Sequence, residues 1–258
     1  MAERKQMTNA FSPKRIGRWF RELGELWSGR RSPGLFVAVG TEDGVRYVML
    51  PDRIWSTKSH EFWVFLGALL HCLKPESILE LGSGRSSIYL SEYADKQKKK
   101  FVSIDSNEKW VEVHRFIARF GGLENDYFHL VSIDSTGYYD ESEVKDLITQ
   151  PPDFVYLDGP NESRSGLMQH AYTLGFCEQA DVIVIDDIQW RHVYDQMEIF
   201  KSKGKTRNAT IISYKGPHIT QYVAFLVCDD LQPIVDDLLQ MLKIEPVKDY
   251  AREQCIED

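Results

Sequence analysis

Three aspartates at the ends of two apolar runs have a spacing that would suit metal chemistry. Asp158 closes one run, and Asp186 and Asp187 close the next. If the runs are neighbouring parallel strands, their carboxyl ends meet at one edge of the sheet, where three carboxylates repel one another strongly. A hard cation with oxygen ligands removes that repulsion, so the pattern predicts Mg²⁺ at these aspartates. The alternative is structural: Asp187 caps a helix that begins near Trp190, and Asp186 lines the site.

A glycine-rich turn stands between an apolar run and a helical pattern, so the segment predicts strand, tight loop and helix. Gly82 and Gly84 let the loop turn sharply and let a ligand lie against the backbone, while Ser86 and Ser87 can cap the helix. Glu80 precedes the glycines, where it would repel a pyrophosphate but receive the cationic end of an amino-acid-like ligand. The alternative is a strand-to-helix turn with no ligand.

The pattern Glu80-x-Gly82-x-Gly84 resembles the first motif of class I S-adenosylmethionine-dependent methyltransferases. This resemblance covers about residues 60–228 and implies an enzyme that binds S-adenosylmethionine through Glu80, Gly82, Gly84 and Ser86. A nicotinamide-dependent oxidoreductase would share the loop, but it would place a third glycine where Ser87 stands.

Two further acids follow predicted strands. Asp105 comes 21 positions after Gly84, about the distance expected of an acid that binds ribose hydroxyls, and the resembling family uses an acid at this place. Its alternative role is to cap the next helix. By the same resemblance Asp134 would accept the adenine amino group, although Asp134 also begins a good turn sequence.

Asp158 with the Asp186-Asp187 pair looks like the metal site of metal-dependent O-methyltransferases of the catechol and sugar branches. The catechol branch has a lysine three residues after the first metal aspartate, where this chain has Asn161. That departure favours an aliphatic hydroxyl, on a sugar or another small polar molecule. Asp158 and His192 are the predicted catalytic residues, with His192 as an ordinary helix-surface histidine in the alternative reading.

The elements that would position these residues alternate regularly after the glycine loop. Strand-helix alternation predicts an α/β fold with a doubly wound, mostly parallel, Rossmann-like sheet of seven strands. The last two strands are joined by a connection too short for a helix, so they should form an antiparallel hairpin. The expected strands are 78–81, 101–105, 128–133, 154–158, 182–186, 209–214 and 222–228.

Residues 1–58 are expected to form an N-terminal extension, and residues 59–258 the S-adenosylmethionine-binding domain. Within the extension, 12–27 reads as a basic amphipathic helix, and 35–39 with 46–50 as a β-hairpin. The helix would pack on its own domain or on a second subunit in a homodimer. Peripheral contact with a membrane is the alternative.

Bulk properties narrow the class of protein. Net charge is −8, which disfavours a general nucleic-acid binder. The resemblance to O-methyltransferases implies a small molecule or glycan as the acceptor. The four cysteines form no Cys-x-x-Cys pair, and no apolar run reaches bilayer length, so a cytoplasmic protein is expected. Two alternative functions stay open: a metal-free methyltransferase acting on nitrogen, and a non-catalytic scaffold with this fold.

Overall fold

The computed structural model describes residues 35–41, 44–50, 60–120, 122–123, 126–135, 137, 139–159, 175–202, 204–215 and 220–256. The chain divides into two compact units, Met1–Ile54 and Trp55–Asp258. In the first unit, β1 (Leu35–Thr41) pairs antiparallel with β2 (Gly44–Leu50), over the residues for which the sequence predicts a hairpin. The predicted basic helix at 12–27 lies outside the described residues.

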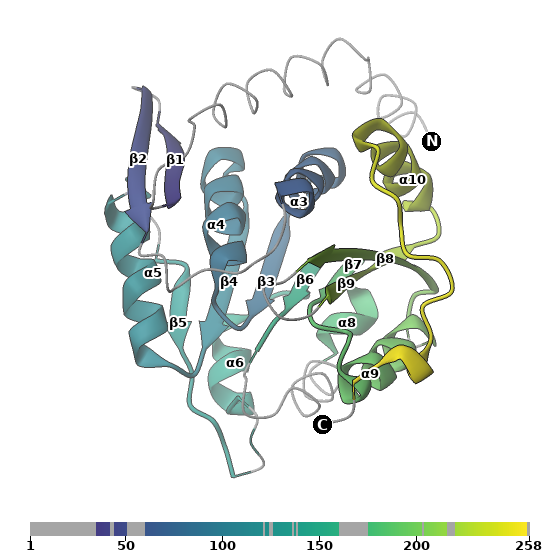
Figure 1. Cartoon of the computed structure of the whole chain (residues 1–258). Coiled ribbons are helices and arrows are strands. Elements are labelled where there is room, and N and C mark those ends of the chain that lie inside the picture. The colour runs from purple at the N-terminus through teal and green to yellow at the C-terminus, as the bar shows by residue number, and fades with distance from the viewer. Residues whose placement is uncertain are drawn as a thin grey trace, which may run out of the picture. The chain divides into compact units, whose positions relative to one another are not determined.

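The second unit is built on a seven-stranded sheet with the order β5-β4-β3-β6-β7-β9-β8 (Figure 1). Neighbours from β5 to β7 are parallel, and β9 runs antiparallel to both β7 and β8. This confirms the predicted mostly parallel sheet with a closing antiparallel hairpin. The strands are β3 (Ser77–Leu81), β4 (Lys100–Asp105), β5 (Phe128–Leu130), β6 (Phe154–Leu157), β7 (Val182–Ile185), β8 (Arg207–Lys215) and β9 (Thr220–Cys228).

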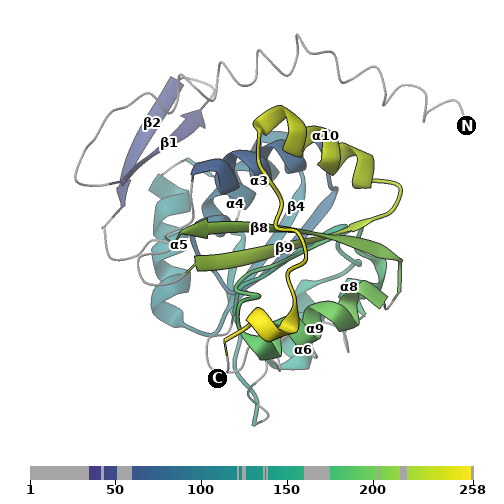
Figure 2. The same cartoon turned by 45° about the vertical axis from the view of Figure 1, so that its right-hand side comes forward.

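Helices cover both faces of the sheet: α3, α4, α5 and α10 on one, and α6, α8 and α9 on the other (Figure 2). Among the described residues no helix has both the length and the apolar character that crossing a membrane requires. The helices are α3 (His60–Leu73), α4 (Arg85–Gln97), α5 (Glu108–Phe120), α6 (Glu141–Leu147), α8 (Phe176–Gln179), α9 (Arg191–Ser202) and α10 (Gln232–Leu242), followed by the short 3₁₀ helix η3 (Arg252–Gln254).

Burial explains why the central strands read as continuous apolar runs. Every residue of β3, β6 and β7 is buried, as expected for parallel strands covered on both faces. Strand β5 is shorter than predicted and ends at Leu130. The chain then turns, and Ile133 forms an isolated antiparallel bridge with Tyr139.

The topology fixes where a ligand site should lie. From β3 the chain proceeds outward through β4 to β5, while β6 lies on the other side of β3, so the strand order reverses between β3 and β6. In open α/β sheets, ligands bind at the carboxyl ends of the strands beside such a switch point. The glycine loop follows β3 at this place.

Candidate functional site: a glycine loop at the switch point

Gly82 brings the loop after β3 into backbone contact with the loop after β6. Its φ of +93° is a conformation that side chains rarely adopt, and a Cβ atom there would lie 2.4 Å from Gly159 N. The restriction is mutual, because a Cβ on Gly159 would lie 2.7 Å from Gly82 Cα. Gly159 is therefore a second required glycine, a role that sequence reasoning missed although Gly159 directly follows a site aspartate.

Gly84 is a glycine for a different reason. Its backbone is extended, with φ −156°, and a Cβ atom would meet its nearest neighbour, Asp158 Oδ2, at an ordinary 3.7 Å. The protein's own packing would therefore accept a Cβ atom at Gly84. The nearest group to that position is the Asp158 carboxylate, so an acidic side chain lies beside the glycine loop.

Glu80 lies beneath the loop and is fully buried. Its Oε2 accepts hydrogen bonds from Ser87 Oγ at 2.5 Å and Ser103 Oγ at 2.6 Å, while Ser87 Oγ accepts from Gly84 N–H at 2.8 Å. Glu80 thus holds the loop through Ser87, a contact that the sequence did not reveal. Oε1 is buried and has no partner with hydrogen-bond geometry among the described residues, although the Ser86 hydroxyl also lies close enough to help lower the pKa of Glu80. We therefore predict that Oε1 receives the cationic end of a ligand.

Burial raises the pKa of Glu80 to about 7 from an ordinary value of 4.5, against the opposing effect of the serine hydroxyls. A carboxyl group in this environment readily holds a proton near neutral pH. A ligand ammonium group near Oε1 would favour the ionised form instead, because opposite charges attract strongly where water is excluded.

Asp105 lies at the end of β4, where the ribose-binding acid was predicted. Its Oδ2 accepts from Ser83 N–H at 2.8 Å and its Oδ1 accepts from Asn107 N–H at 2.7 Å. The second contact matches the alternative, local role, while the first ties Asp105 to the glycine loop. The ribose contact stays a prediction. Ser86 is buried in the first turn of α4, next to the loop.

Asp134 lies after β5 in the turn that the alternative reading proposed. Its main-chain carbonyl accepts from Gly137 N–H at 3.1 Å, and its side chain is half-buried. The adenine contact of Asp134 stays a prediction.

Asp158 and Asp186 follow adjacent strands in matching positions. Because Leu157 pairs with Ile185 in the β6–β7 ladder, the next two residues emerge on the same side of the sheet. Asp186 is buried, and its Oδ1 accepts from Tyr214 Oη–H at 3.3 Å and from Asp187 N–H at 2.9 Å. Sequence reasoning correctly placed both carboxylates at the carboxyl edge.

Asp187 differs from Asp158 and Asp186 in its backbone conformation and in its side-chain partners. Its backbone is left-handed, with φ +58°, and its Oδ1 accepts from Gln189 Nε2 at 2.8 Å and Gln221 Nε2 at 3.4 Å. A left-handed non-glycine residue at a strand end is uncommon and is associated with functional sites. Neither glutamine was identified from the sequence.

The predicted metal triad is not assembled. Within the described part of the chain, no three Asp, Glu, His or Cys side chains are grouped so that they could hold a metal ion. Asp158 Oδ2 lies beside Gly84, and two glutamines contact the Asp187 carboxylate. Mg²⁺ therefore stays a prediction without a preformed site.

The carboxylates nevertheless create a strongly negative region. Burial raises the pKa of Tyr156 well above its ordinary value, and Asp186, Asp158 and Glu80 raise it further. Tyr156 lies in β6 between the strands that carry these acids, beside Glu80 in the β3–β6 ladder. The region favours a cationic or proton-donating ligand group.

Of the two remaining residues from the sequence analysis, the structure describes His192 but not Asn161. His192 lies half-buried in the first turn of α9, five positions after Asp187. Asn161 falls outside the described residues, so the structure adds nothing to the argument about the missing lysine.

Comparison with known proteins agrees with this geometry. No family model and no curated protein sequence matches the chain. The structure is similar to that of cofactor-bound Rv0187 from MTB, with a TM-score of 0.50, 21% identity, and coverage of 69% of this chain and 83% of that one. It is also similar to a candidate O-methyltransferase from Klebsiella pneumoniae, with a TM-score of 0.51, 14% identity, and coverage of 69% and 84%.

The strand order, the closing antiparallel hairpin and the glycine loop at the switch point define the fold of class I S-adenosylmethionine-dependent methyltransferases. The resemblance seen in the sequence is confirmed at the level of the fold. The metal-dependent branch of these proteins is not established by this likeness.

Proposed function

We propose that the protein is a methyltransferase that uses S-adenosylmethionine to methylate a hydroxyl oxygen on a sugar or another small polar molecule. The observation that carries this proposal is the glycine loop at the switch point of the sheet, with the Asp158 carboxylate beside Gly84. Two further features fit the cofactor: the unpaired, buried Glu80 Oε1, which suits its ammonium group, and Asp105 at the end of β4.

S-adenosylmethionine supplies an electrophilic methyl group on a sulfonium. The chain's contribution is to bind and orient: Gly82 lets the loop pack against Gly159, Gly84 would let the cofactor approach the backbone, and Asp105 steadies the loop at Ser83 N–H. In-line approach of the acceptor oxygen then forms the new carbon–oxygen bond as the carbon–sulfur bond breaks. Orientation of this kind supplies a large share of the acceleration.

Asp158 is the proposed proton acceptor because its carboxylate lies beside the loop, where the transferred methyl group and the acceptor would meet. The hydroxyl proton moves to Asp158 as the oxygen attacks, which leaves a neutral ether product and S-adenosylhomocysteine. His192 is the second candidate base. The described residues present no group of three Asp, Glu, His or Cys side chains for a metal, so the proposed steps are assigned to the chain's own residues.

A metal-free transfer to nitrogen is the second candidate. The negative region around Tyr156 favours it, since the same carboxylates would attract an ammonium group and accept its proton. Both proposed reactions place the acceptor beside Asp158. They are therefore distinguished by which acceptors, hydroxyl compounds or amines, become methylated.

The test uses S-adenosylmethionine labelled in its methyl group, with panels of sugars, other polyols and primary amines as acceptors. Hydroxyl methylation supports the first proposal, and labelling of amines alone supports the second. Isothermal titration with S-adenosylhomocysteine comes first, because absence of binding by the folded protein would refute both candidates and favour a scaffold.

A pair of variants locates the reaction. Asp158→Asn should lower turnover at least about 100-fold while leaving binding of S-adenosylhomocysteine intact, in line with the loss of a general base. Asp181→Asn is the matched control: this aspartate precedes β7 at the opposite edge of the sheet and pairs with Lys205. Equal activity of the two variants would refute the role of Asp158.

A further inference from the structure

A buried histidine on α5 contacts the glycine loop from behind. His114 is 1% exposed, and its Nε2 lies 2.8 Å from the main-chain oxygen of Gly84, thirty residues earlier in the chain. Its Nδ1 lies 2.8 Å from the main-chain oxygen of Trp110, one turn back in the same helix. A contact from α5 thus reaches a glycine of the proposed cofactor loop.

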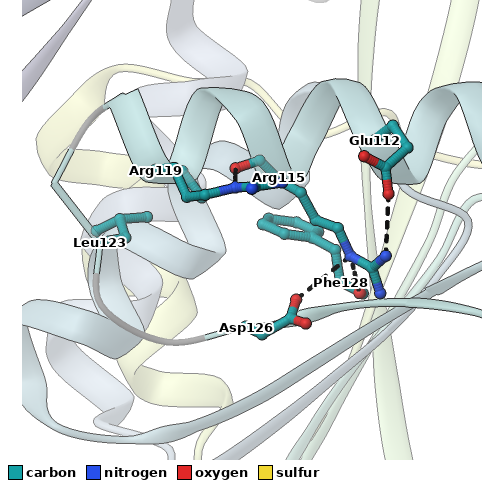
Figure 3. A pocket seen from close by; sticks show the side chains of 7 residues that line it. Glu112, Arg115, Arg119, Leu123, Asp126 and Phe128 are labelled. Atoms are coloured by element: carbon teal, nitrogen blue, oxygen red, sulfur yellow. Dashed lines mark hydrogen bonds and ion pairs between the residues drawn. The ribbon is translucent and has the colours of Figure 1, made fainter.

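The imidazole ring is held firmly in place. Phe128 of β5 packs against it with a centroid distance of 5.4 Å, and Trp110 lies at 5.9 Å. The adjacent Arg115 fixes α5 to β5, because its Nε donates to the Phe128 carbonyl at 3.0 Å and its Nη1 donates to Glu112 at 3.0 Å (Figure 3). His114 therefore contacts the loop from a helix that Arg115 joins to β5.

The two carbonyl partners of His114 are not equivalent. A neutral imidazole has a single N–H donor, and burial lowers the pKa of His114 against the effect of both carbonyls. Trp110 O is in the position that accepts a main-chain N–H within a helix. Gly84 O is the carbonyl of the N-cap of α4 and also lies 3.2 Å from Ser87 N. A proton on Nε2 would join α5 to the glycine loop, whereas a proton on Nδ1 would serve a contact within α5.

We infer that His114 is a positioning residue for the cofactor loop, with its Nε2–H donating to Gly84 O. Gly84 is then fixed on both sides, since its N–H donates to Ser87 Oγ and its carbonyl accepts from His114. The peptide groups on both sides of Gly84 are thereby held in one orientation. This inference rests on the proposed function, because it concerns binding of the same cofactor.

The test measures the affinity for S-adenosylhomocysteine by isothermal titration in three variants at this position. His114→Gln places an amide donor near the position of Nε2 and should stay within about threefold of the wild type. His114→Asn places its amide near Nδ1, and His114→Phe keeps the ring shape without a donor. Both should bind at least about tenfold more weakly, the usual effect of losing one buried hydrogen bond.

The control is His129→Phe, which changes a half-buried histidine on β5 and should leave affinity unchanged. Circular dichroism and thermal unfolding identify any variant that fails to fold. Recovery by glutamine but not by asparagine supports the inference, because general damage to the core would not discriminate between two amides. Wild-type affinity in a folded His114→Phe protein, or recovery by asparagine alone, would overturn it. If the wild type binds no S-adenosylhomocysteine, the proposed function fails as well.

Discussion

Glu80→Gln should change how the stability of the protein depends on pH. The unfolded chain releases the Glu80 proton near pH 4.5, whereas the folded chain releases it near pH 7 because the carboxyl group is buried. Between these values the unfolded state binds fewer protons than the folded state. The free energy of unfolding of the wild type therefore falls as pH rises through this window.

The magnitude follows from the same two pKa values. At about 1.4 kcal/mol for each pH unit, the ionised carboxylate lowers the free energy of unfolding at pH 8 by up to about 3 kcal/mol relative to pH 4.5. Glutamine has no proton to lose, while its carbonyl oxygen can still accept from Ser87 and Ser103. In a domain of this size, 3 kcal/mol corresponds to about 6–12 °C in melting temperature.

The assay is thermal and urea unfolding of both proteins, without ligand, at half-unit steps from pH 4.5 to 8. We expect the stability difference between Glu80→Gln and the wild type to shift in favour of the variant by about 3 kcal/mol across this range. Glu76→Gln is the control, since this glutamate is exposed just before β3. If the free energies of unfolding of Glu80→Gln and the wild type change with pH in the same way, burial does not raise the pKa of Glu80.

Two further predictions concern the loop and the metal. Gly84→Val should fold but bind S-adenosylhomocysteine at least about 100-fold more weakly, since its Cβ makes only ordinary contacts in the protein while its methyl groups would occupy the position proposed for the ligand. Gly82→Ala is the contrasting variant and should lower the melting temperature, because its Cβ would lie 2.4 Å from Gly159 N. Normal binding of S-adenosylhomocysteine by Gly84→Val would refute the proposal that the ligand lies beside Gly84. If Mg²⁺ assists the reaction, excess EDTA and Asp187→Ala should each abolish methyl transfer while sparing cofactor binding. Full activity in EDTA would end the metal hypothesis and leave Asp158 and His192 as the candidate bases.

The sequence by itself determined the order of the elements and the place of the glycine loop. Apolar runs alternating with helical patterns are local signals, and both faces of β3, β6 and β7 are buried, so these strands stand out in the sequence. A short connection without room for a helix similarly required the antiparallel pairing of β8 and β9. Aspartates at strand ends could be assigned to one edge on topology alone.

Only the tertiary structure decided which side chains meet there. Gly159 touches Gly82, and His114 reaches Gly84, because loops and helices far apart in the chain pack together. The metal hypothesis required three carboxylates to converge, and no such group of ligands is present among the described residues. Asp187, whose backbone is left-handed after β7, is contacted by two glutamines that the sequence did not identify. Sequence spacing predicts the edge at which a residue emerges. The direction of its side chain depends on backbone angles and packing partners that are set when distant segments come into contact.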